Sequence, residues 1–302
     1  IKRLPPDTFK TQSRGGKGVI GLTTKEEDSV EMFFATNTHA DILFFTTRGR
    51  VFQLKAYDVP PASRTAKGQA LVNFLQTSNE EKVNAVVSLD SLEGRKFLVM
   101  VTRHGLIKKV DITDFSNVRR SGLIGIKLKN GDALEWVKPS NGKNEVVLAT
   151  RSGQAIRFKE TDVRPMGRTA SGVRGIRLKG SDEVIGMDIV NTSQLDDALL
   201  LVVTANGYGK RTSIKEYKVQ SRGGSGIKTV NVTPKTGQLA GAMIVNKAMS
   251  PETTNDLIAI SSHGQTIRLP LKSISVLGRA TQGVRIMSLK EKDDRVSSVT
   301  TV

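Results

Sequence analysis

Short apolar segments and glycine-containing polar turns alternate along the whole chain. For example, Ile42–Thr47 is followed by the turn Arg48-Gly49-Arg50 and then by the apolar run Val51–Leu54. Two apolar runs joined by such a turn predict a β-hairpin. The same pattern returns around Gly105, Gly153, Gly207 and Gly264. Helical periodicity over about ten residues is hard to find anywhere, so the pattern predicts an all-β protein.

A second repeated element is an arginine followed four residues later by a glycine, just before a short alternating apolar run. It occurs at Arg14–Gly18, Arg64–Gly68, Arg168–Gly172, Arg222–Gly226 and Arg279–Gly283. A degenerate copy ends at Gly122, where Val118 holds the arginine position and Arg119 and Arg120 stand beside it. The six glycines are separated by 50, 54, 50, 54 and 57 residues. A near-constant period of this length indicates one supersecondary unit that is used six times.

Each repeat offers about four short strands. Two flank the turn glycine, one follows the arginine-containing motif (for example Val173–Leu178), and one is a further apolar run such as Val83–Leu89. The sequence therefore predicts a propeller-like toroid of six four-stranded blades, in a single domain over residues 1–302. With one tryptophan, Trp136, the chain does not match the tryptophan–aspartate propellers.

The chain opens inside its first repeat. Ile1–Leu4 aligns with Val51–Leu54, the second strand of a predicted hairpin. We therefore expect the sequence to be a piece of a larger protein. No signal peptide is recognisable, and the absence of cysteine suits a cytoplasmic location.

Basic residues outnumber acidic ones, 46 to 29, which gives a net charge of +17 and favours a polyanionic partner. The cations recur in every repeat, so a positive belt around the toroid is expected, with a generally basic surface as the alternative. The predicted DNA-binding cations are Arg48, Arg50, Arg64, Lys67, Lys108, Lys109, Arg119, Arg120, Arg157, Arg168, Arg174, Lys210, Arg211, Arg222, Arg268, Arg279 and Arg285. The longest purely apolar run, Ala198–Val203, is too short to span a membrane, so no membrane partner is expected.

Aromatic residues make up only 5% of the chain. Proteins that bind single strands usually stack exposed bases on aromatic side chains. The composition thus favours contacts to the backbone of duplex DNA. Because phosphate contacts do not read bases, little sequence specificity is expected.

The motifs of catalysis are not found. The Gly-Lys pairs at 16–17, 142–143 and 209–210 are each followed by a residue other than Ser or Thr, so none completes a phosphate-binding loop of an NTPase. The histidines His39, His104 and His263 are interpreted as turn residues, not metal ligands. The chain is predicted to be a non-catalytic binding module that holds no cofactor and no metal.

One basic glycine-rich heptad is the strongest candidate for a phosphate contact. Its residues are Gln12, Ser13, Arg14, Gly15, Gly16, Lys17 and Gly18. Glycines let the backbone N–H groups join two cations at a phosphate, although the heptad alone could be an ordinary basic turn. A near-copy follows later, at Gln220, Ser221, Arg222, Gly223, Gly224, Ser225 and Gly226. We expect it to be a second DNA-guiding corner; the alternative is a tight turn with Arg222 merely solvated.

These motifs resemble the family of DNA gyrase A C-terminal domains. The family's heptad, Gln-(Arg/Lys)-Arg-Gly-Gly-(Arg/Lys)-Gly, is matched at 12–18 except at Ser13, where a cation is usual. Thr169–Leu178, Asn206–Thr212 and Val276–Gly283 are also similar to this family. The resemblance implies a six-bladed β-pinwheel that wraps duplex DNA chirally around its rim, so that the parent enzyme can introduce negative supercoils.

The same resemblance implies what lies outside this chain. The nucleophilic tyrosine and the ATPase belong to other parts of the parent enzyme, so ATP and Mg²⁺ are expected only in the whole complex. The implied partners are duplex DNA, the rest of gyrase A in a homodimer, and gyrase B, in the bacterial cytoplasm and associated with the nucleoid.

Three other readings stay open at this stage. The nearest is the C-terminal domain of topoisomerase IV, which binds or bends DNA but usually has fewer blades and a degenerate heptad. The chain could also be a scaffold that docks acidic proteins, or a structural RNA binder. Affinity that grows with DNA length over several tens of base pairs would separate wrapping from these alternatives.

Overall fold

The structure is a computed structural model that describes residues 1–5, 36–63, 66–78, 80–89, 92–247, 256–263, 265–289, 291 and 293–301. These residues form twenty β-strands and several 3₁₀-helices, and none of them lies in an α-helix. The prediction of an all-β protein is therefore confirmed. The 3₁₀-helices are η2 (Ala56–Asp58), η3 (Leu71–Asn73), η5 (Ile112–Phe115), η6 (Glu160–Asp162), η7 (Thr192–Gln194), η8 (Ile214–Glu216) and η9 (Leu271–Ser273).

The strands form five sheets, each built around one antiparallel hairpin. The first sheet has the order β3 (Val83–Ser88), β1 (Asp41–Thr46), β2 (Arg50–Lys55), β6 (Leu123–Ile124). The second has the order β7 (Leu134–Ser140), β4 (Phe97–Thr102), β5 (Leu106–Asp111), β10 (Val173–Arg174). The third has the order β11 (Val184–Val190), β8 (Glu145–Thr150), β9 (Gln154–Lys159), β14 (Val219–Gln220), and β15 (Ile227–Lys228) also pairs with β9.

The last two sheets follow the same plan. The fourth has the order β16 (Leu239–Asn246), β12 (Ala198–Thr204), β13 (Tyr208–Ser213), β19 (Val284–Arg285). The fifth contains β20 (Val296–Thr301), β17 (Asp256–Ser261) and β18 (Thr266–Pro270). The predicted hairpins around Gly49, Gly105, Gly153, Gly207 and Gly264 correspond to β1–β2, β4–β5, β8–β9, β12–β13 and β17–β18.

The outer strand of a sheet comes from a later repeat. β6 follows the second hairpin in the sequence, yet it pairs with β2 of the first hairpin. In the same way β10 pairs with β5, β15 with β9, and β19 with β13. The repeats therefore exchange strands, and each blade is completed by the motif strand of the repeat that follows.

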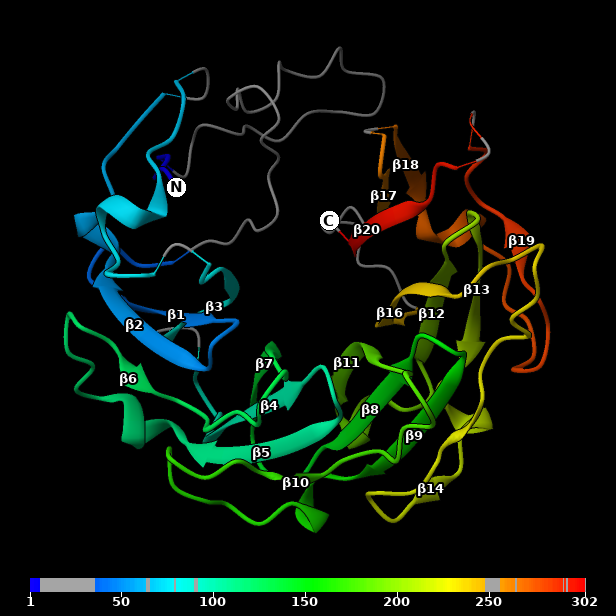
Figure 1. Ribbon diagram of the computed structural model, residues 1–302, viewed down its shortest axis with the longest axis horizontal. Helices are drawn as coiled ribbons and strands as arrows, with labels where there is room; N and C mark the ends of the chain where they lie inside the picture. Colours follow the sequence, from blue (N-terminus) through cyan, green and yellow to red (C-terminus); the bar gives the residue numbers. More distant parts are fainter. Residues whose placement is uncertain are drawn as a thin grey trace.

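The five sheets follow one another around an arc, from β1–β3 through β4, β8 and β12 to β17 (Figure 1). The edge strands β3, β7, β11, β16 and β20 lie toward the middle of the arc. The opposite edge strands β6, β10, β14 and β19 lie on its outside (Figure 1). The outer rim is thus formed by the segments that contain the arginine-containing motifs.

The prediction of six blades is corrected to five sheets in the described part of the chain. Most of the first repeat, residues 6–35, lies outside the described ranges. Within residues 1–5, Arg3 forms a parallel bridge with Pro61, and the N–H of Gln69 donates to Ile1 O at 2.9 Å. The segment around Ile1–Leu4 therefore pairs with the chain beside the next motif loop, as β2 pairs with β6. The predicted alignment of these two segments is confirmed.

The hairpin turns explain the repeated glycine. Gly49, Gly105, Gly153 and Gly207 have φ between +72° and +84°, a region that strains residues with a Cβ. A hydroxyl at the end of the first strand closes each turn; for example, Thr102 Oγ1 accepts the N–H of Leu106 at 3.1 Å. Equivalent bonds join Thr46 to Arg50, Thr150 to Gln154, Thr204 to Tyr208 and Ser261 to Gln265.

The turn carbonyls bind the following repeat. The carbonyl oxygen of Gly105 accepts from the N–H of Gly175 at 2.8 Å, and that of Gly207 accepts from Ile286 at 2.9 Å. Gly49 O binds Gly125 N–H and Gly153 O binds Thr229 N–H in the same way. These bonds connect every described hairpin from β1–β2 to β12–β13 with the motif strand that crosses it.

The hydrophobic cores lie between neighbouring sheets. Along β4, Leu98 and Met100 pack with the first sheet, whereas Val99 and Val101 pack with the third. The central strands β8 and β12 alternate in the same way, with side chains buried on both faces. A strand buried on both faces appears as a continuous apolar run, which is why the hairpin strands stand out in the sequence.

Candidate nucleic-acid interface

Each motif loop crosses the outer strand of the preceding hairpin. Before the loop, the chain runs parallel to that strand, as in the bridges Lys109–Pro165 and Arg211–Val276 and in the pairing of β14 with β9. After the loop it runs antiparallel, as β10, β15 and β19. The motif glycine permits this reversal, because a Cβ at Gly172 would lie 2.6 Å from Ile107 O, and one at Gly283 would lie 2.7 Å from Gly209 O.

Successive motif segments are joined by backbone hydrogen bonds. The N–H of Lys127 donates to Ala170 O at 3.2 Å, and the N–H of Arg177 donates to Gly224 O at 2.8 Å. The N–H of Asn231 donates to Thr281 O at 3.2 Å, which continues the series. The rim from residue 127 to residue 281 is therefore one connected belt of backbone, which we call the motif belt.

Exposed cations project from this belt and its loops. Among the predicted residues, Lys67, Arg119, Arg120, Arg174 and Arg285 are exposed, and Arg168, Arg222 and Arg279 are half-buried. Sequence reasoning missed four further exposed cations, which are Lys127, Lys129, Arg177 and Lys228. The sequence pattern does mark these four cations, because they alternate with the buried residues of the motif strands, such as Ile126 and Ile176.

The motif arginines are held at the rim by the preceding segment of the belt. Arg222 donates from Nε to Asp162 O at 2.9 Å and from Nη1 to Arg174 O at 3.3 Å. Arg279 donates from Nη1 to Lys228 O at 3.2 Å, which is the equivalent position one repeat later. Each guanidinium keeps further N–H groups beyond these bonds, because it has five.

The second heptad-like turn, Gln220–Gly226, folds over strand β9. Its two flanks pair with the same strand, β14 parallel and β15 antiparallel. Gly223 has a φ of +80° and donates its N–H to Gly175 O at 2.7 Å, while a Cβ at Gly226 would lie 2.7 Å from Ala155 O. Gly226 is thus required by the close approach of the chain to strand β9, whereas Gly223 is favoured by its positive φ.

Arg285 illustrates an exposed cation that is held by an aromatic ring. Its guanidinium lies 5.4 Å from the ring centroid of Tyr208, and Nη2 donates to the Tyr208 hydroxyl at 2.9 Å. This hydrogen bond from Arg285 lowers the pKa of Tyr208. Lys235 lies over the same ring at 5.6 Å, so three groups form a rigid basic cluster beside β19.

Five of the predicted DNA-binding cations are buried, which corrects the expectation that they belong to an exposed belt. Lys108, Lys109, Arg157, Lys210 and Arg211 are at most 8% exposed. They lie in β5, β9 and β13, and β5 shows why they are buried: its Val110 packs with the first sheet and its Ile107 with the third, so both faces of the strand are covered. They therefore bind groups within the protein.

Three of these cations bind the turn of 3₁₀-helix in the next repeat. Arg157 donates from Nη1 to Ile214 O at 2.8 Å and to Tyr217 O at 3.0 Å, and from Nε to Glu145 at 2.5 Å. Arg211 donates from Nε to Ile274 O at 2.8 Å, and Lys109 donates to Glu160 O at 3.2 Å. Their role in the structure is to connect blades.

Three of the predicted cations at hairpins form ion pairs within their own sheets. Arg48 lies 3.1 Å from Glu80, and Arg50 lies 2.9 Å from Glu81. Arg268 lies 2.7 Å from Asp256. These contacts reduce the charge that each hairpin presents to a polyanion.

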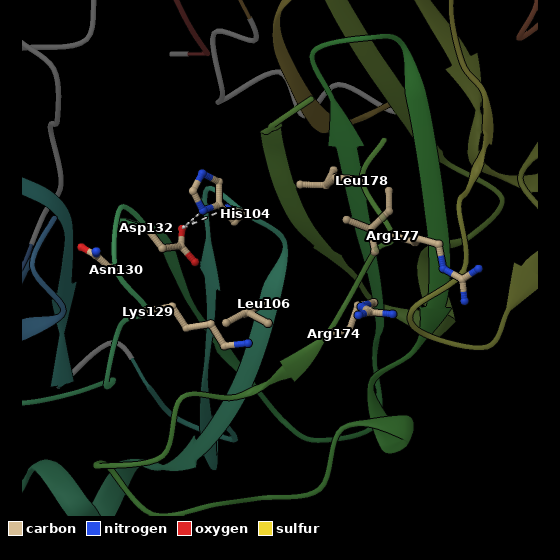
Figure 2. Close-up of a pocket in the computed structure, with 9 residues that line it drawn as sticks. His104, Leu106, Lys129, Asn130, Asp132, Arg174, Arg177 and Leu178 are labelled. Carbon is tan, nitrogen blue, oxygen red and sulfur yellow. Dashed lines mark hydrogen bonds and ion pairs between the residues drawn. The ribbon is translucent and has the colours of Figure 1, made fainter. Parts of the chain in front are cut away.

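A cleft of about 510 Å³ opens between two segments of the motif belt. Lys129, Arg174 and Arg177 line it, together with apolar residues such as Leu106 and Ile176. In Figure 2, Leu106 lies between Lys129 and Arg174, and His104 lies beside Asp132. The lining of the cleft therefore combines three cations with apolar side chains.

The histidines lie at or beside turns, as predicted, and two of them meet carboxylates. His104 Nδ1 is 3.7 Å from Asp132, and His263 Nδ1 is 2.8 Å from Glu291. Asp293 lies 3.8 Å from His263 Nε2, so three exposed potential ligand atoms gather at this turn. The contact between His263 Nδ1 and Glu291 Oε2 is short enough for a hydrogen bond.

The first heptad, Gln12–Gly18, and Arg64 lie outside the described residues. Their predicted roles therefore remain predictions. No helix of the part that the structure describes is long and apolar enough to cross a membrane.

The fold and the rim define a basic β-propeller whose blades exchange strands through arginine-containing corners. The chain belongs to the family described as "DNA gyrase C-terminal domain, beta-propeller", which matches it in six segments: residues 1–37, 40–90, 96–141, 144–191, 198–246 and 255–302. The chain is 43% identical to the DNA gyrase A protein of Mycolicibacterium smegmatis over 298 residues, which are 98% of this chain and 34% of that protein. The sequence thus spans about a third of the length of the curated relatives that it matches.

Solved structures support the same fold. The C-terminal domain of DNA topoisomerase IV superposes with a TM-score of 0.79 at 24% identity, over 88% of this chain and 80% of that one. A DNA gyrase A C-terminal domain superposes with a TM-score of 0.72 at 23% identity, over 99% of this chain and 95% of that one. At these identities the similarity concerns the fold, while the relationship to gyrase A rests on the sequence comparisons.

Proposed function

We propose that this chain binds duplex DNA along the motif belt and wraps it chirally, so that a parent DNA gyrase can introduce negative supercoils. The observation that supports this most is the belt itself, because it places exposed cations from several blades on one connected rim. Phosphate contacts of this kind position DNA without reading its sequence. Binding is then largely independent of sequence.

Several blades must contribute, because bending DNA is expensive. A domain of this length has a radius of about 25 Å from the usual size scaling, so the axis of DNA on its rim lies at about 35 Å. Smooth elastic estimates put a half-turn at that curvature at about 10 kcal/mol or more. Two cations cannot offset this energy, whereas contacts distributed over the rim can.

We also propose that the repeat at residues 1–37 contributes a sixth blade. The support is that this segment is one of the six that match the family. The heptad at 12–18 would then stand on the rim as the corner of that blade, and Gln220–Gly226, the fifth of the six motifs, would be a second DNA-guiding corner.

The wider context follows from the family and belongs to this proposal. The partners would be the rest of gyrase A in a homodimer, and gyrase B. ATP and Mg²⁺ would act in the parent complex and not on this chain. The site of action would be the bacterial cytoplasm, at the nucleoid.

A ligation assay tests the proposal directly. The chain is mixed with nicked circular DNA, the nick is sealed, and the deproteinised topoisomers are separated on a gel. A shift of linking number toward positive values, increasing with the amount of protein, supports chiral wrapping.

Other outcomes favour the alternatives. Salt-sensitive binding without a linking-number shift would indicate bending or docking, as for a domain of the topoisomerase IV type. Binding to duplex RNA as tightly as to DNA would favour the RNA reading. Absence of nucleic-acid binding would leave the scaffold for acidic proteins.

A further inference from the structure

The corners of the rim are of two kinds, which differ in whether a lysine lies beneath the loop. Lys108 and Lys210 each occupy the third position after a hairpin turn glycine, in β5 and β13, and both are 0% exposed. Lys2, in the segment that aligns with β2, holds the same position by sequence. We call these three residues the pinning lysines.

Each pinning lysine binds the backbone of the motif loop above it. Lys108 Nζ donates to the carbonyl oxygens of Gly125 at 2.8 Å and Ala170 at 3.1 Å, and also to that of Arg168. Lys210 Nζ donates to Gly278 O at 2.6 Å, Arg279 O at 2.5 Å and Thr281 O at 3.2 Å.

The third pinning lysine makes the same kind of contact. Lys2 Nζ donates to Ala66 O at 2.7 Å and to Ser63 O at 3.4 Å. Three ammonium groups thus lie beneath three motif loops, at equivalent positions of the fold.

The loops above the pinning lysines share a sequence. They read Arg-Thr-Ala-Lys-Gly at 64–68, Arg-Thr-Ala-Ser-Gly at 168–172 and Arg-Ala-Thr-Gln-Gly at 279–283. The loops at 118–122 and 222–226 differ, and the residues at the lysine position beneath them are Phe52 and Ile156. Pinned corners therefore alternate along the chain with corners that lie on an apolar side chain.

The inward carbonyls determine where the loop N–H groups point. In a trans peptide the C=O and the next N–H point in opposite directions, so a carbonyl that faces the lysine sends the following N–H outward. The carbonyl of Gly278 faces Lys210, and the N–H of Arg279 correspondingly points outward, where it donates to Glu216 Oε2 at 3.2 Å. A carboxylate already occupies the outer side of this corner, which shows that the corner accepts an anion.

A gain in folding stability does not explain why the charges of Lys108 and Lys210 are buried. Burial lowers the pKa of Lys108 to about 8 and that of Lys210 to about 8. Asp114 and Arg168 face Lys108 with opposite effects, as Glu216 and Arg279 face Lys210. A lowered lysine pKa means that holding the charge at neutral pH disfavours the folded state, so the charge calls for another role.

We propose that the pinned corners over Lys108 and Lys210 are phosphate-binding sites for the DNA backbone, in which these two lysines are positioning residues that aim the loop N–H groups and the motif arginine outward, and in which Glu216 holds the place of a phosphate at the corner over Lys210. This inference deepens the proposed function and depends on duplex DNA being the partner. It predicts two equivalent contacts that are separated by one corner of the rim.

The main test replaces the lysines by a side chain of similar length without charge. The variants Lys108→Met and Lys210→Met are compared with the unchanged chain for binding a labelled duplex of several tens of base pairs across a salt series. We expect each substitution to reduce the slope of log affinity against log salt by about 1 and the affinity by about fivefold. Lys143→Met, which removes an exposed charge outside the motif belt, serves as the control and should change the slope by less than half as much.

A second variant does not depend on how well the lysine variants fold. Glu216→Gln removes the carboxylate from the Arg279 N–H, so duplex affinity should rise by about two- to fivefold. Glu93→Gln removes an exposed carboxylate from a different turn and controls for net charge. An equal rise in both variants would overturn the assignment of Glu216 as a phosphate stand-in.

A pH profile separates positioning from simple support of the fold. Duplex curvature, measured by energy transfer between labelled ends, should fall as pH rises from about 7 to about 9, as the two lysines lose their protons. The double variant Lys108→Met, Lys210→Met should show a flat profile. A profile equal to that of the unchanged chain would contradict the inference.

The outcomes also separate this inference from the proposed function. If the unchanged chain binds duplex DNA with a steep salt dependence but folded lysine variants keep the same slope, the corners are not phosphate sites, although the proposed function stands. If the unchanged chain binds no duplex DNA, the proposed function fails and the inference fails with it.

Discussion

The carbonyl oxygen of Met287 lies only 2.2 Å from the place where a Cβ on Gly207 would stand. Gly207 closes the hairpin β12–β13, whereas Met287 belongs to the motif strand of the following repeat, whose N–H donates back to Gly207 O at 3.0 Å. The two residues are 80 apart in the sequence (287 − 207). This contact links the hairpin turn to the strand that the following repeat contributes. Tertiary packing therefore requires glycine at position 207, in addition to the conformation of the turn.

Gly207→Ala should destabilise the protein strongly. Gly207 has a φ of +79°, and the added methyl group would meet backbone, so the free energy of unfolding should fall by about 3 kcal/mol. Gly180→Ala is the matched control, because Gly180 has a φ of +56° and no atom within 4 Å of an added Cβ, and should cost about 1 kcal/mol. Urea unfolding followed by circular dichroism measures both, and equal losses would contradict the argument.

The buried pair of Arg157 and Glu145 should matter more than any exposed pair. Both side chains are at most 8% exposed, so Arg157→Met leaves a buried carboxylate and should lower the free energy of unfolding by about 3–5 kcal/mol. Arg268→Met breaks the pair with Asp256, in which the arginine side chain is 57% exposed, and should cost less than about 1 kcal/mol. Urea unfolding measures both variants. A small loss of unfolding free energy in Arg157→Met would show that water reaches Glu145.

Asp294 should give the protein a specific sensitivity to acid. Burial opposes its ionisation, but hydrogen bonds from Ser261, Ser262 and the N–H groups of His263 and Arg295 outweigh burial and lower the pKa to about 2. Because the folded pKa lies below the ordinary aspartate value of 3.8, the stabilisation is complete above that value and is lost as pH falls from about 4 to 2.

The measurement is the midpoint of urea unfolding between about pH 5 and pH 2. Asp294→Asn should flatten the decline in this window relative to the unchanged chain, whereas Asp197→Asn, at an exposed position, should keep it. Parallel declines in all three proteins would show that other carboxylates dominate.

Removing a cation from the motif belt should change the salt dependence of DNA binding in steps. Arg174→Ala and Arg285→Ala each remove an exposed arginine, so each should reduce the slope of log affinity against log salt by about 0.9 if it neutralises one phosphate. Lys143→Ala lies outside the belt and should leave the slope nearly unchanged. Fluorescence anisotropy with a labelled duplex gives the slopes; unaltered slopes in both arginine variants would place the DNA elsewhere.

Alanine at all seven positions of Gln12–Gly18 should separate binding from wrapping. The other repeats keep their cations, so we expect the fold and much of the DNA affinity to persist. The linking-number shift in the ligation assay should disappear. A full shift in this variant would refute a wrapping role of the heptad.

Much of the fold could be predicted because its units are local. The hairpins around Gly49 and Gly105 combine apolar runs with a turn whose positive φ requires glycine, and both signals are visible within about fifteen residues. The motif glycines were found in the same way, by their period. The number of blades was not confirmed in this way, since the described residues form five sheets whereas the motif glycines repeat six times.

The candidate site was predicted less well. Charge alone does not distinguish Lys108, which binds three carbonyl oxygens beneath a loop, from Arg174, which is exposed two residues after a motif glycine. Both stand in or beside short strands and both are basic. The difference arises from which face of β5 and β10 the neighbouring repeat covers.

The sequence by itself determined the all-β class, the repeat, the turns and the positive charge, because hydrophobic alternation and glycine conformation act within a few residues. Only the tertiary structure decided that outer strands come from the following repeat, that Lys109, Arg157 and Arg211 connect blades, and that Arg222 and Arg279 stand on the rim. These facts depend on contacts between residues about 50 to 80 positions apart. Such contacts form when a buried polar group finds its partner in another repeat, and no local pattern specifies which partner that is.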